Sequence, residues 1–406
     1  MTVTAFDPFN LDVPVSHQAW RGTAGWVGLW LWAVAGLVIV MVVVGGATRL
    51  TGSGLSITEW RPLSGMLPPL SEADWSGEFA RYRGSPQYQL LNAGMSLAGF
   101  KSIFWWEWGH RQLGRFIGFV FAGGFVLGLA ARAFPWSVGV RLAGMGLLLG
   151  LQGLIGWVMV ASGLKPGMTA VEPVDLAVHL LLAALFLAAV VATATTLGRG
   201  GAPAPGHSMP RGAVLLARLL VGLVLLQLVL GALTAGSHAG LIHNSWPTMD
   251  GRFVPPFDEL FAATPWWVNI FENVTLIQFD HRMLAYIVLA LALWNAAAWS
   301  RPGRDRKLGR LALALAVLVL AQLALGIVTL LLAVPPAAAL GHQFLAMLVL
   351  AAVVRLAVLS KPLPLPSTAA VEPPPCDACC DAISPDHAGG GSKRPAAALV
   401  LAGASS

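Results

Sequence analysis

Four histidines stand out in this chain because each lies at the start of a long apolar stretch: His110, His179, His281 and His342. The dipeptide His-Arg at 110–111 recurs at 281–282, and "VHLLLAALFLAAV" (178–190) resembles "GHQFLAMLVLAAV" (341–353). A single histidine at a helix end most often binds a lipid headgroup or an unpaired amide. Four at equivalent places favour a functional role, because ionisable groups within membrane segments are usually functional.

Two histidines in each half of the chain favour haem over zinc as the ligand. Zinc takes three or four nitrogen, sulfur or carboxylate ligands, and the apolar body has neither a cysteine nor an HExxH helix. Haem iron takes two axial imidazoles from opposite sides, and a four-helix bundle can hold the flat macrocycle. Gly114 and Gly118 follow His110 at four-residue steps and narrow one helix face, although such residues more often serve helix contact.

The stretch "FWWEWGHRQLGRF" (104–116) adds charged groups beside the first histidine. Glu107 lies three residues before His110, on the same helix face, where an acid could move protons or stabilise positive charge on a haem ring. The alternative is an ion pair with Arg111, four residues on. Arg111 and Arg282 could pair with haem propionates, and their alternative is snorkelling to headgroups. Gln278 replaces the acid before His281, so we predict a reactive haem in the N-terminal half and a redox or structural haem in the C-terminal half.

The composition requires a membrane to position these residues. Of 406 residues, 56% are hydrophobic and only 11% are charged, and the mean hydropathy of +0.72 excludes a soluble domain. A hydrocarbon core about 30 Å thick takes roughly 20 apolar residues per helix. Eight segments meet that test: 25–47, 110–131, 138–161, 176–197, 213–236, 279–299, 309–333 and 338–359. The first 20 residues lack a basic n-region and an Arg-rich amphipathic pattern, so we expect no cleaved signal or transit peptide.

Lysine and arginine alternate between the loops and predict the orientation. The loops after the second, fourth and sixth spans are basic: Arg132 and Arg141; Arg199 and Arg211; Arg301, Arg304, Arg306, Lys307 and Arg310. The other loops are poor in basic residues. The positive-inside rule then places both termini in the cytoplasm and all four histidines near the outer surface. The net charge of +6 follows from this topology and requires no nucleic acid partner.

The sequence repeats itself, and the repeat defines the domains. Glutamine and glycine recur four residues apart in the intervening helices, at 152 and 156, 227 and 231, and 322 and 326. We predict an all-α integral membrane protein with eight transmembrane helices arranged as two four-helix bundles in parallel repeat. The predicted segments are a cytoplasmic tail (1–24), an N-terminal bundle (25–197, outer loop 48–106), a cytoplasmic linker (198–212), a C-terminal bundle (213–359, outer loop 237–275) and a disordered cytoplasmic tail (360–406).

That tail contains all three cysteines of the chain, Cys376, Cys379 and Cys380. With His387, the Cys-x-x-Cys pair could bind a metal, but no second spaced pair is present. The richness in Pro, Gly and Ala favours disorder.

Six motifs in residues 40–355 resemble the haem A synthase family. They are "GGATRLTGSGLSITEWRPLSGMLPP" (45–69), "FKSIFWWEWGHRQLGR" (100–115), "LQGLIGWVMVASGL" (151–164), "NSWPTMDGRFVPP" (244–256), "FENVTLIQFDHR" (271–282) and "GHQ" (341–343). The chain is most similar to the alphaproteobacterial and mitochondrial type, which lacks cysteine pairs in the outer loops.

This resemblance implies an oxidoreductase of the bacterial inner membrane that converts haem O to haem A for cytochrome oxidase. A ring methyl would become a formyl group through two hydroxylations and loss of water. The resemblance implies that His110 and His179 hold the substrate haem O, that His281 and His342 hold a permanent haem B, and that Glu107 is the family's acid. A protohaem farnesyltransferase would supply haem O, an electron acceptor is required, and a homo-oligomer is left open.

Four residues depart from the family pattern. Gly99 stands where glutamate is common, Asp175 where arginine is expected before His179, and His238 and His243 where acidic and aromatic residues are expected. None of them replaces a predicted haem ligand.

Two other functions remain open from the residues. The first is a di-haem membrane electron carrier without chemistry on haem, against which the asymmetry at Glu107 argues. The second is a permease built on a parallel repeat, which would require a polar midplane that the Leu/Val/Ala-rich helix centres lack.

Overall fold

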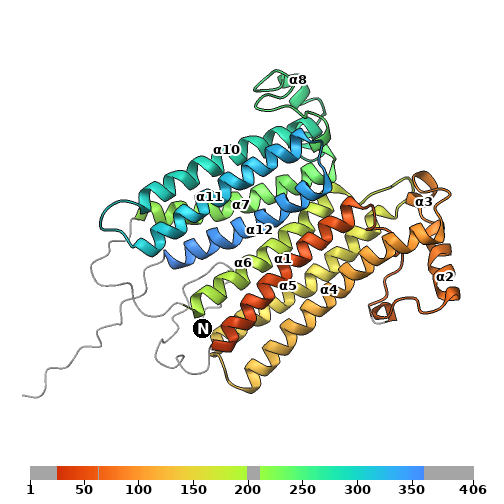
Figure 1. Cartoon of the computed structure of the whole chain (residues 1–406), viewed down its shortest axis with the longest axis horizontal. Coiled ribbons are helices and arrows are strands. Elements are labelled where there is room, and N and C mark those ends of the chain that lie inside the picture. Colours follow the sequence, from red (N-terminus) through yellow and green to blue (C-terminus); the bar gives the residue numbers. More distant parts are fainter. Residues whose placement is uncertain (1–24, 63, 199–210, 361–406) are drawn as a thin grey trace, which may run out of the picture. The chain divides into compact units, whose positions relative to one another are not determined.

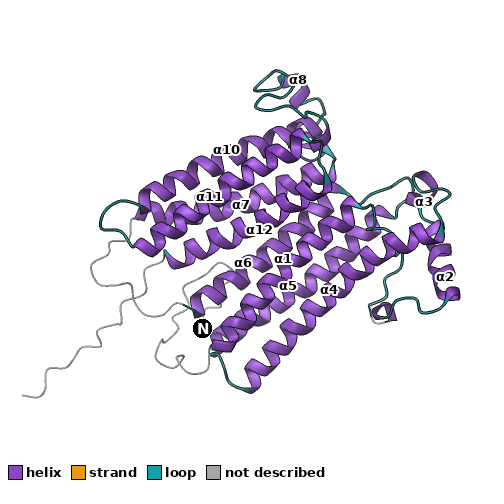
Figure 2. Ribbon diagram, viewed as in Figure 1, coloured by secondary structure: helices purple, strands orange, loops and turns teal. Residues whose placement is uncertain are grey.

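Eight long helices make up the membrane body. The computed structural model describes residues 25–62, 64–198 and 211–360, and in these ranges it is helical with irregular loops and no named strand (Figures 1 and 2). The helices long and apolar enough to cross a membrane are α1 (Gly25–Leu50), α4 (Leu97–Ala130), α5 (Trp136–Gly163), α6 (Pro173–Leu197), α7 (Arg211–Gly236), α10 (Val274–Trp299), α11 (Arg306–Leu331) and α12 (Pro336–Leu359). This confirms the predicted all-α membrane fold. The predictions for 1–24, most of the linker, and the tail with its cysteines lie outside the described residues.

Each half forms a closed ring of four helices with the same order of neighbours. In the first half α1 packs on α4, α4 on α5, α5 on α6, and α6 on α1. In the second half α7, α10, α11 and α12 repeat this order and close through α12 on α7. Figure 1 shows these helices running side by side. A common neighbour order in both halves is what a parallel repeat of one four-helix unit produces.

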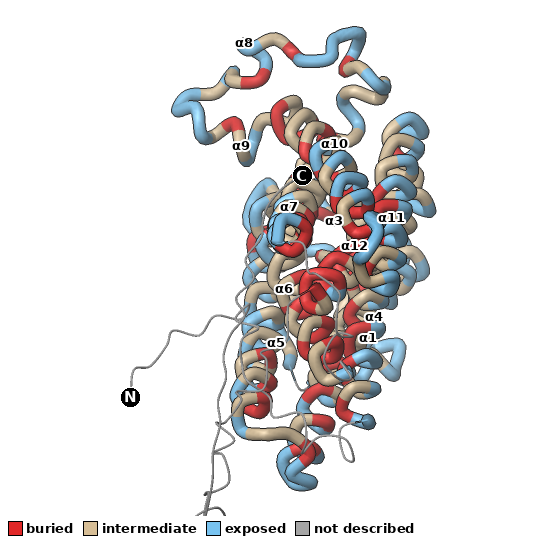
Figure 3. The backbone as a smooth tube through the Cα atoms, turned by 90° about the vertical axis from the view of Figure 1, so that its left-hand side faces the viewer, coloured by how far each residue is buried: buried red, intermediate tan, exposed pale blue. Residues whose placement is uncertain are grey.

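The two rings join through their first and fourth helices. Helix α6 packs on α7 and α12, and α1 also packs on α12; Gln343 Nε2 on α12 donates to the Val42 carbonyl of α1 at 3.0 Å. Since α6 has neighbours on several sides, it is apolar around most of its circumference, as a buried helix must be. Figure 3 shows buried residues concentrated along α6, α12 and α1. One hydrophobic core therefore extends across both halves.

Helix α4 begins 13 residues before the predicted span, at Leu97 instead of residue 110. The Ser96 hydroxyl caps it by accepting from the Gly99 amide at 3.2 Å. These additional turns carry Phe100 and Phe104, which pack with Trp75 and Tyr82 of α2 (Glu72–Arg83) in a small aromatic core. Lys101 and Glu107 lower the hydropathy of this segment. Hydropathy along the sequence therefore places the start of the helix too late.

Short helices build the long loops before α4 and α10, which the charge pattern predicts to lie outside and which are called the outer loops here. The first loop contains η1 (Ser64–Met66), α2 and α3 (Pro86–Leu90); the second contains η2 (Ala239–Leu241), α8 (Phe257–Leu260), η3 (Trp266–Val268) and α9 (Asn269–Glu272). Asn273 connects the second loop to α10: its Oδ1 accepts from the Thr275 and Leu276 amides at 3.0 and 3.2 Å. Its Nδ2 donates to the Glu259 carbonyl at 2.8 Å. Each loop is thus anchored at the start of the helix that carries the first histidine of its half.

Candidate haem sites

Each of the four histidine rings lies against a glycine of the preceding long helix. A Cβ atom placed on these glycines would lie only 2.8–3.2 Å from the ring Cε1, whereas carbon atoms in favourable contact are about 3.5–4.0 Å apart. The glycine–histidine pairs and distances are Gly45–His110 (2.9 Å), Gly156–His179 (2.9 Å), Gly231–His281 (3.2 Å) and Gly326–His342 (2.8 Å). Only glycine permits this approach, so all four rings are held in one repeated geometry.

A glutamine lies beside three of the four rings, one turn before the glycine. Gln152 Nε2 donates to the His179 carbonyl at 3.1 Å and lies 3.2 Å from both ring nitrogens. Gln227 Nε2 donates to the His281 carbonyl at 2.9 Å and lies 3.1 Å from Nδ1. Gln322 Nε2 lies 3.3 Å from His342 Nε2. The fourth place, four residues before Gly45, is occupied by Met41.

The histidines lie close to one another in pairs within each half. His110 is within electrostatic reach of His179, and His281 of His342. Among the described residues no group of three or more His, Cys, Asp or Glu side chains could share a metal ion. Nδ1 of His110 and of His342 is buried and has no partner in the described part of the chain. Glycine-cradled imidazoles with free ring nitrogens fit the axial ligation of haem.

Glu107 is buried, with 3% of its surface exposed, and both of its carboxylate oxygens accept hydrogen bonds. Its Oε2 accepts from the Ser56 hydroxyl and the Ile57 amide, both at 2.7 Å. Its Oε1 accepts from Arg111 Nε at 3.1 Å. The ion pair named above as the alternative is therefore present, but it is buried and part of a network. This network attaches the outer segment 56–57 to α4 one turn above His110.

Both arginines beside the histidines bind backbone carbonyls of the outer loop in their own half. Arg111 Nη2 donates to the Ile57 carbonyl at 2.8 Å, and Nη1 to the Glu59 carbonyl at 3.2 Å. Arg282 is buried; its Nη2 donates to the His243 carbonyl at 2.6 Å and its Nη1 to the Ser245 carbonyl at 2.9 Å. The guanidinium groups thus clamp equivalent loops, and their pairing with propionates stays a prediction.

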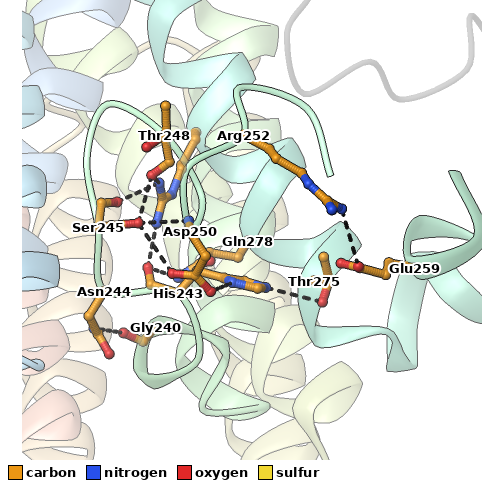
Figure 4. Close-up of polar contacts among 11 residues, drawn as sticks. Gly240, His243, Asn244, Ser245, Thr248, Asp250, Arg252, Glu259, Thr275 and Gln278 are labelled. Carbon is orange, nitrogen blue, oxygen red and sulfur yellow. Dashed lines mark hydrogen bonds and ion pairs between the residues drawn. The ribbon is translucent and has the colours of Figure 1, made fainter. Parts of the chain in front are cut away.

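Figure 4 shows the polar contacts around His243 and Gln278 in the loop of the C-terminal half. Gln278, which takes the place of Glu107, donates from Nε2 to the His243 carbonyl at 3.3 Å. His243 Nδ1 lies 2.6 Å from Asp250 Oδ2, and this hydrogen bond is the main reason that the pKa of Asp250 lies below its usual value. His243 Nε2 lies 3.4 Å from the Thr275 hydroxyl. His243 therefore supports the loop above His281.

The remaining departures from the family pattern have structural places. His238 adopts a left-handed conformation (φ 56°) after α7, and burial, with a smaller effect of nearby Arg49, lowers its pKa. Asp175 lies in the first turn of α6, where the helix dipole favours a negative charge. Gly99 lies in the first turn of α4.

The sequence predicted the histidines but not the residues that surround them. The recurrence of Gln-x-x-x-Gly was interpreted only as a repeat. The same spacing could also have indicated that these residues contact the histidine rings. Gly45 has no glutamine four residues before it, so the pattern does not include it. Recognising it requires the contact between α1 and α4.

Comparison with known proteins identifies the family. The family described as cytochrome oxidase assembly protein matches residues 28–354. The haem A synthase of Methylobacterium radiotolerans is 55% identical over 352 residues, covering 86% of this chain and 94% of that protein. The haem A synthases of Methylorubrum extorquens (strain PA1) and Azorhizobium caulinodans are each 51% identical, over 83% and 80% of this chain and 87% and 91% of those proteins.

The family match includes all or most of each of the eight helices, the four histidines and both loops. Together with the relatives it bears out the resemblance seen in the motifs. The chain therefore belongs to the haem A synthase family of cytochrome oxidase assembly proteins.

Proposed function

We propose that this chain is an oxidoreductase that converts haem O to haem A within the membrane. One ring methyl of haem O becomes a formyl group in two successive hydroxylations followed by loss of water. The observation that carries the proposal is the pair of histidine sites, built alike in two equivalent helix rings, in a chain of this family.

We assign the substrate haem O to the N-terminal half, with His110 and His179 as axial ligands. The C-terminal half would hold a permanent haem B through His281 and His342. The asymmetry between Glu107 and Gln278 supports this division, because only the first half carries an acid beside its ligand. A haem in the second half would supply one-electron transfer, a reaction that histidine-ligated haem supports.

Glu107 is the proposed acid–base group beside the reacting ring. Its two oxygens are oriented from opposite sides, Oε2 by Ser56 and Ile57 and Oε1 by Arg111. A carboxylate held in one orientation and away from bulk solvent can hold or pass on a proton at a fixed position. Arg111 would keep the loop closed over this site, and Arg111 and Arg282 would each pair with a haem propionate in their own half.

The basic loops support a location in the bacterial inner membrane with both termini in the cytoplasm and the haem sites toward the periplasm. The chemistry requires haem O from a protohaem farnesyltransferase, an electron acceptor, and a cytochrome oxidase that receives the product. Eight helices long and apolar enough to cross a membrane support a reaction at the membrane.

Chromatography of haems extracted from the purified chain tests the proposal. Expression in cells that make haem O should yield haem B together with haem A or hydroxylated haem O. Unmodified haem alone would instead support a di-haem electron carrier. A chain without haem would support a permease.

A further inference from the structure

Besides Glu107 and Gln278, the two halves differ on the helix that faces the first histidine of each half. Gly45 and Gly231 take the same place against His110 and His281. Four residues earlier, on the same helix face, α7 has Gln227 and α1 has Met41.

In the C-terminal half, Gln227 holds both the backbone and the ring of His281. Its Nε2 donates to the His281 carbonyl at 2.9 Å and lies 3.1 Å from Nδ1. Its Oε1 is buried and has no partner among the residues described, and the same is true of Gln152 and Gln322. When one ring nitrogen binds iron, the other carries the proton and requires an acceptor. Rotation of the terminal amide would present this oxygen to the ring N–H in place of the bond that Nε2 makes to the His281 carbonyl.

In the N-terminal half, Met41 gives His110 no such contact. Its ε-methyl group packs toward Gly114, one turn beyond His110, and would lie 3.3 Å from a Cβ placed there. A thioether has no donor and is only a weak acceptor. Nδ1 of His110 is buried without a hydrogen-bond partner within the described ranges, and so is Nδ1 of His342, but only His342 has a glutamine beside its ring, with Gln322 Nε2 3.3 Å from its Nε2.

We propose that Met41 leaves His110 as the exchangeable axial ligand, whereas glutamines tether the other three: Gln152 for His179, Gln227 for His281 and Gln322 for His342. This inference rests on the proposed function, in which the N-terminal half takes up haem O and releases haem A in every turnover.

A difference in ligand support matches the different tasks of the two halves. Partners of a metal-ligating histidine orient the ring, and their loss typically weakens metal binding by about 10–100-fold. Two tethered ligands in the C-terminal half suit a haem that stays bound. In the N-terminal half, His179 keeps its tether and orients the substrate, while the coordinate bond to His110 breaks and forms as haem exchanges.

Reciprocal exchange of the two side chains tests the inference in the full-length protein. Met41→Gln adds an amide in the first half, Gln227→Met removes one in the second, and Met41→Leu changes the first side chain without adding an amide. Each purified protein, loaded in cells that make haem O, is mixed with excess apomyoglobin as a haem scavenger. Chromatography of the transferred haem then separates haem O and haem A, from the first half, from haem B, from the second.

We expect Met41→Gln to slow the release of haem O and haem A by about 10–100-fold and to leave the release of haem B unchanged. Gln227→Met should accelerate haem B release by a similar factor, and Met41→Leu should release haem at the wild-type rate. Unchanged release in both exchange variants would overturn the inference. If Gln227→Met does not assemble, Gln322→Met makes the same comparison. A wild-type protein that holds haem B but never haem O or haem A would refute the proposed function instead, and haem B release from Gln227→Met would still test the tether.

Discussion

Replacement of Gly326 by alanine tests whether the glycines position the histidine rings. A Cβ on this residue would lie 2.8 Å from His342 Cε1, the closest of the four approaches. Because favourable carbon contacts are about 3.5–4.0 Å, the ring must retreat by roughly 1 Å. The overlapping atom belongs to the end of a side chain and not to backbone, so we expect the ring to turn and the helices to stay in place.

The expected effect is therefore large on the ligand and small on the fold. Overpacking of a rigid core lowers the free energy of unfolding by about 1–3 kcal/mol. Because the histidine ring can rotate, we expect a loss at the lower end of this range. A misplacement of about 1 Å at a reacting group can cost about 10²-fold in rate. Loss of correct ring orientation should also weaken haem affinity by about 10–100-fold.

The assay is haem B content together with the low-spin bis-imidazole signal in electron paramagnetic resonance. Gly326→Ala should lose or shift this signal while expression and thermal stability remain near those of the wild type. Gly222→Ala on α7 is the matched control, because a Cβ there meets no atom within 4 Å. Gly45→Ala should spare haem B and reduce haem A. An unchanged low-spin signal and full haem B in Gly326→Ala would refute the reasoning.

Four further predictions follow from the proposed sites. Glu107→Gln should retain haem B but lower conversion of haem O to haem A by about 10²–10⁴-fold, the usual contribution of one acid–base group; near-normal haem A in extracts would reduce Glu107 to a structural role. His281→Ala should abolish the low-spin spectrum of haem B, and a full haem B complement with unchanged absorption would disprove that ligand. A reporter active only in the periplasm should work when fused after Met249 and be silent near Gly303, and the reverse result would invert the topology. The pKa of Asp250 is lowered mainly by its hydrogen bond from His243. The contact should therefore persist at and above the ordinary pKa of a carboxyl group and be lost as the pH falls through the lowered pKa. Asp250→Asn should accelerate hydrogen exchange in this loop at neutral pH, and equal exchange would argue against the contact.

Hydropathy, charge and repetition are local properties, and they were sufficient for the membrane fold. An apolar run of about 20 residues is helical in a bilayer because each backbone group must find its partner within the segment. The repeated His-Arg and Gln-x-x-x-Gly patterns also predicted equivalent halves, which the matching order of helix neighbours confirms. The start of α4 was wrong by 13 residues, since its outer turns are stabilised by packing on Trp75 and Tyr82 and not by lipid.

The partners of the functional side chains depended on segments that are distant in the sequence. Sequence reasoning considered propionates or headgroups for Arg111, but the guanidinium reaches the carbonyls of Ile57 and Glu59, more than 50 residues away. For Glu107 an exposed ion pair with Arg111 was the alternative to an acid at the haem ring, yet the folding of residues 56–57 over α4 buries the carboxylate. Spacing along one helix specifies which residues share a face. It does not specify which carbonyl, glycine or methionine of another segment contacts that face. Those contacts form only when the four helices of each half pack together.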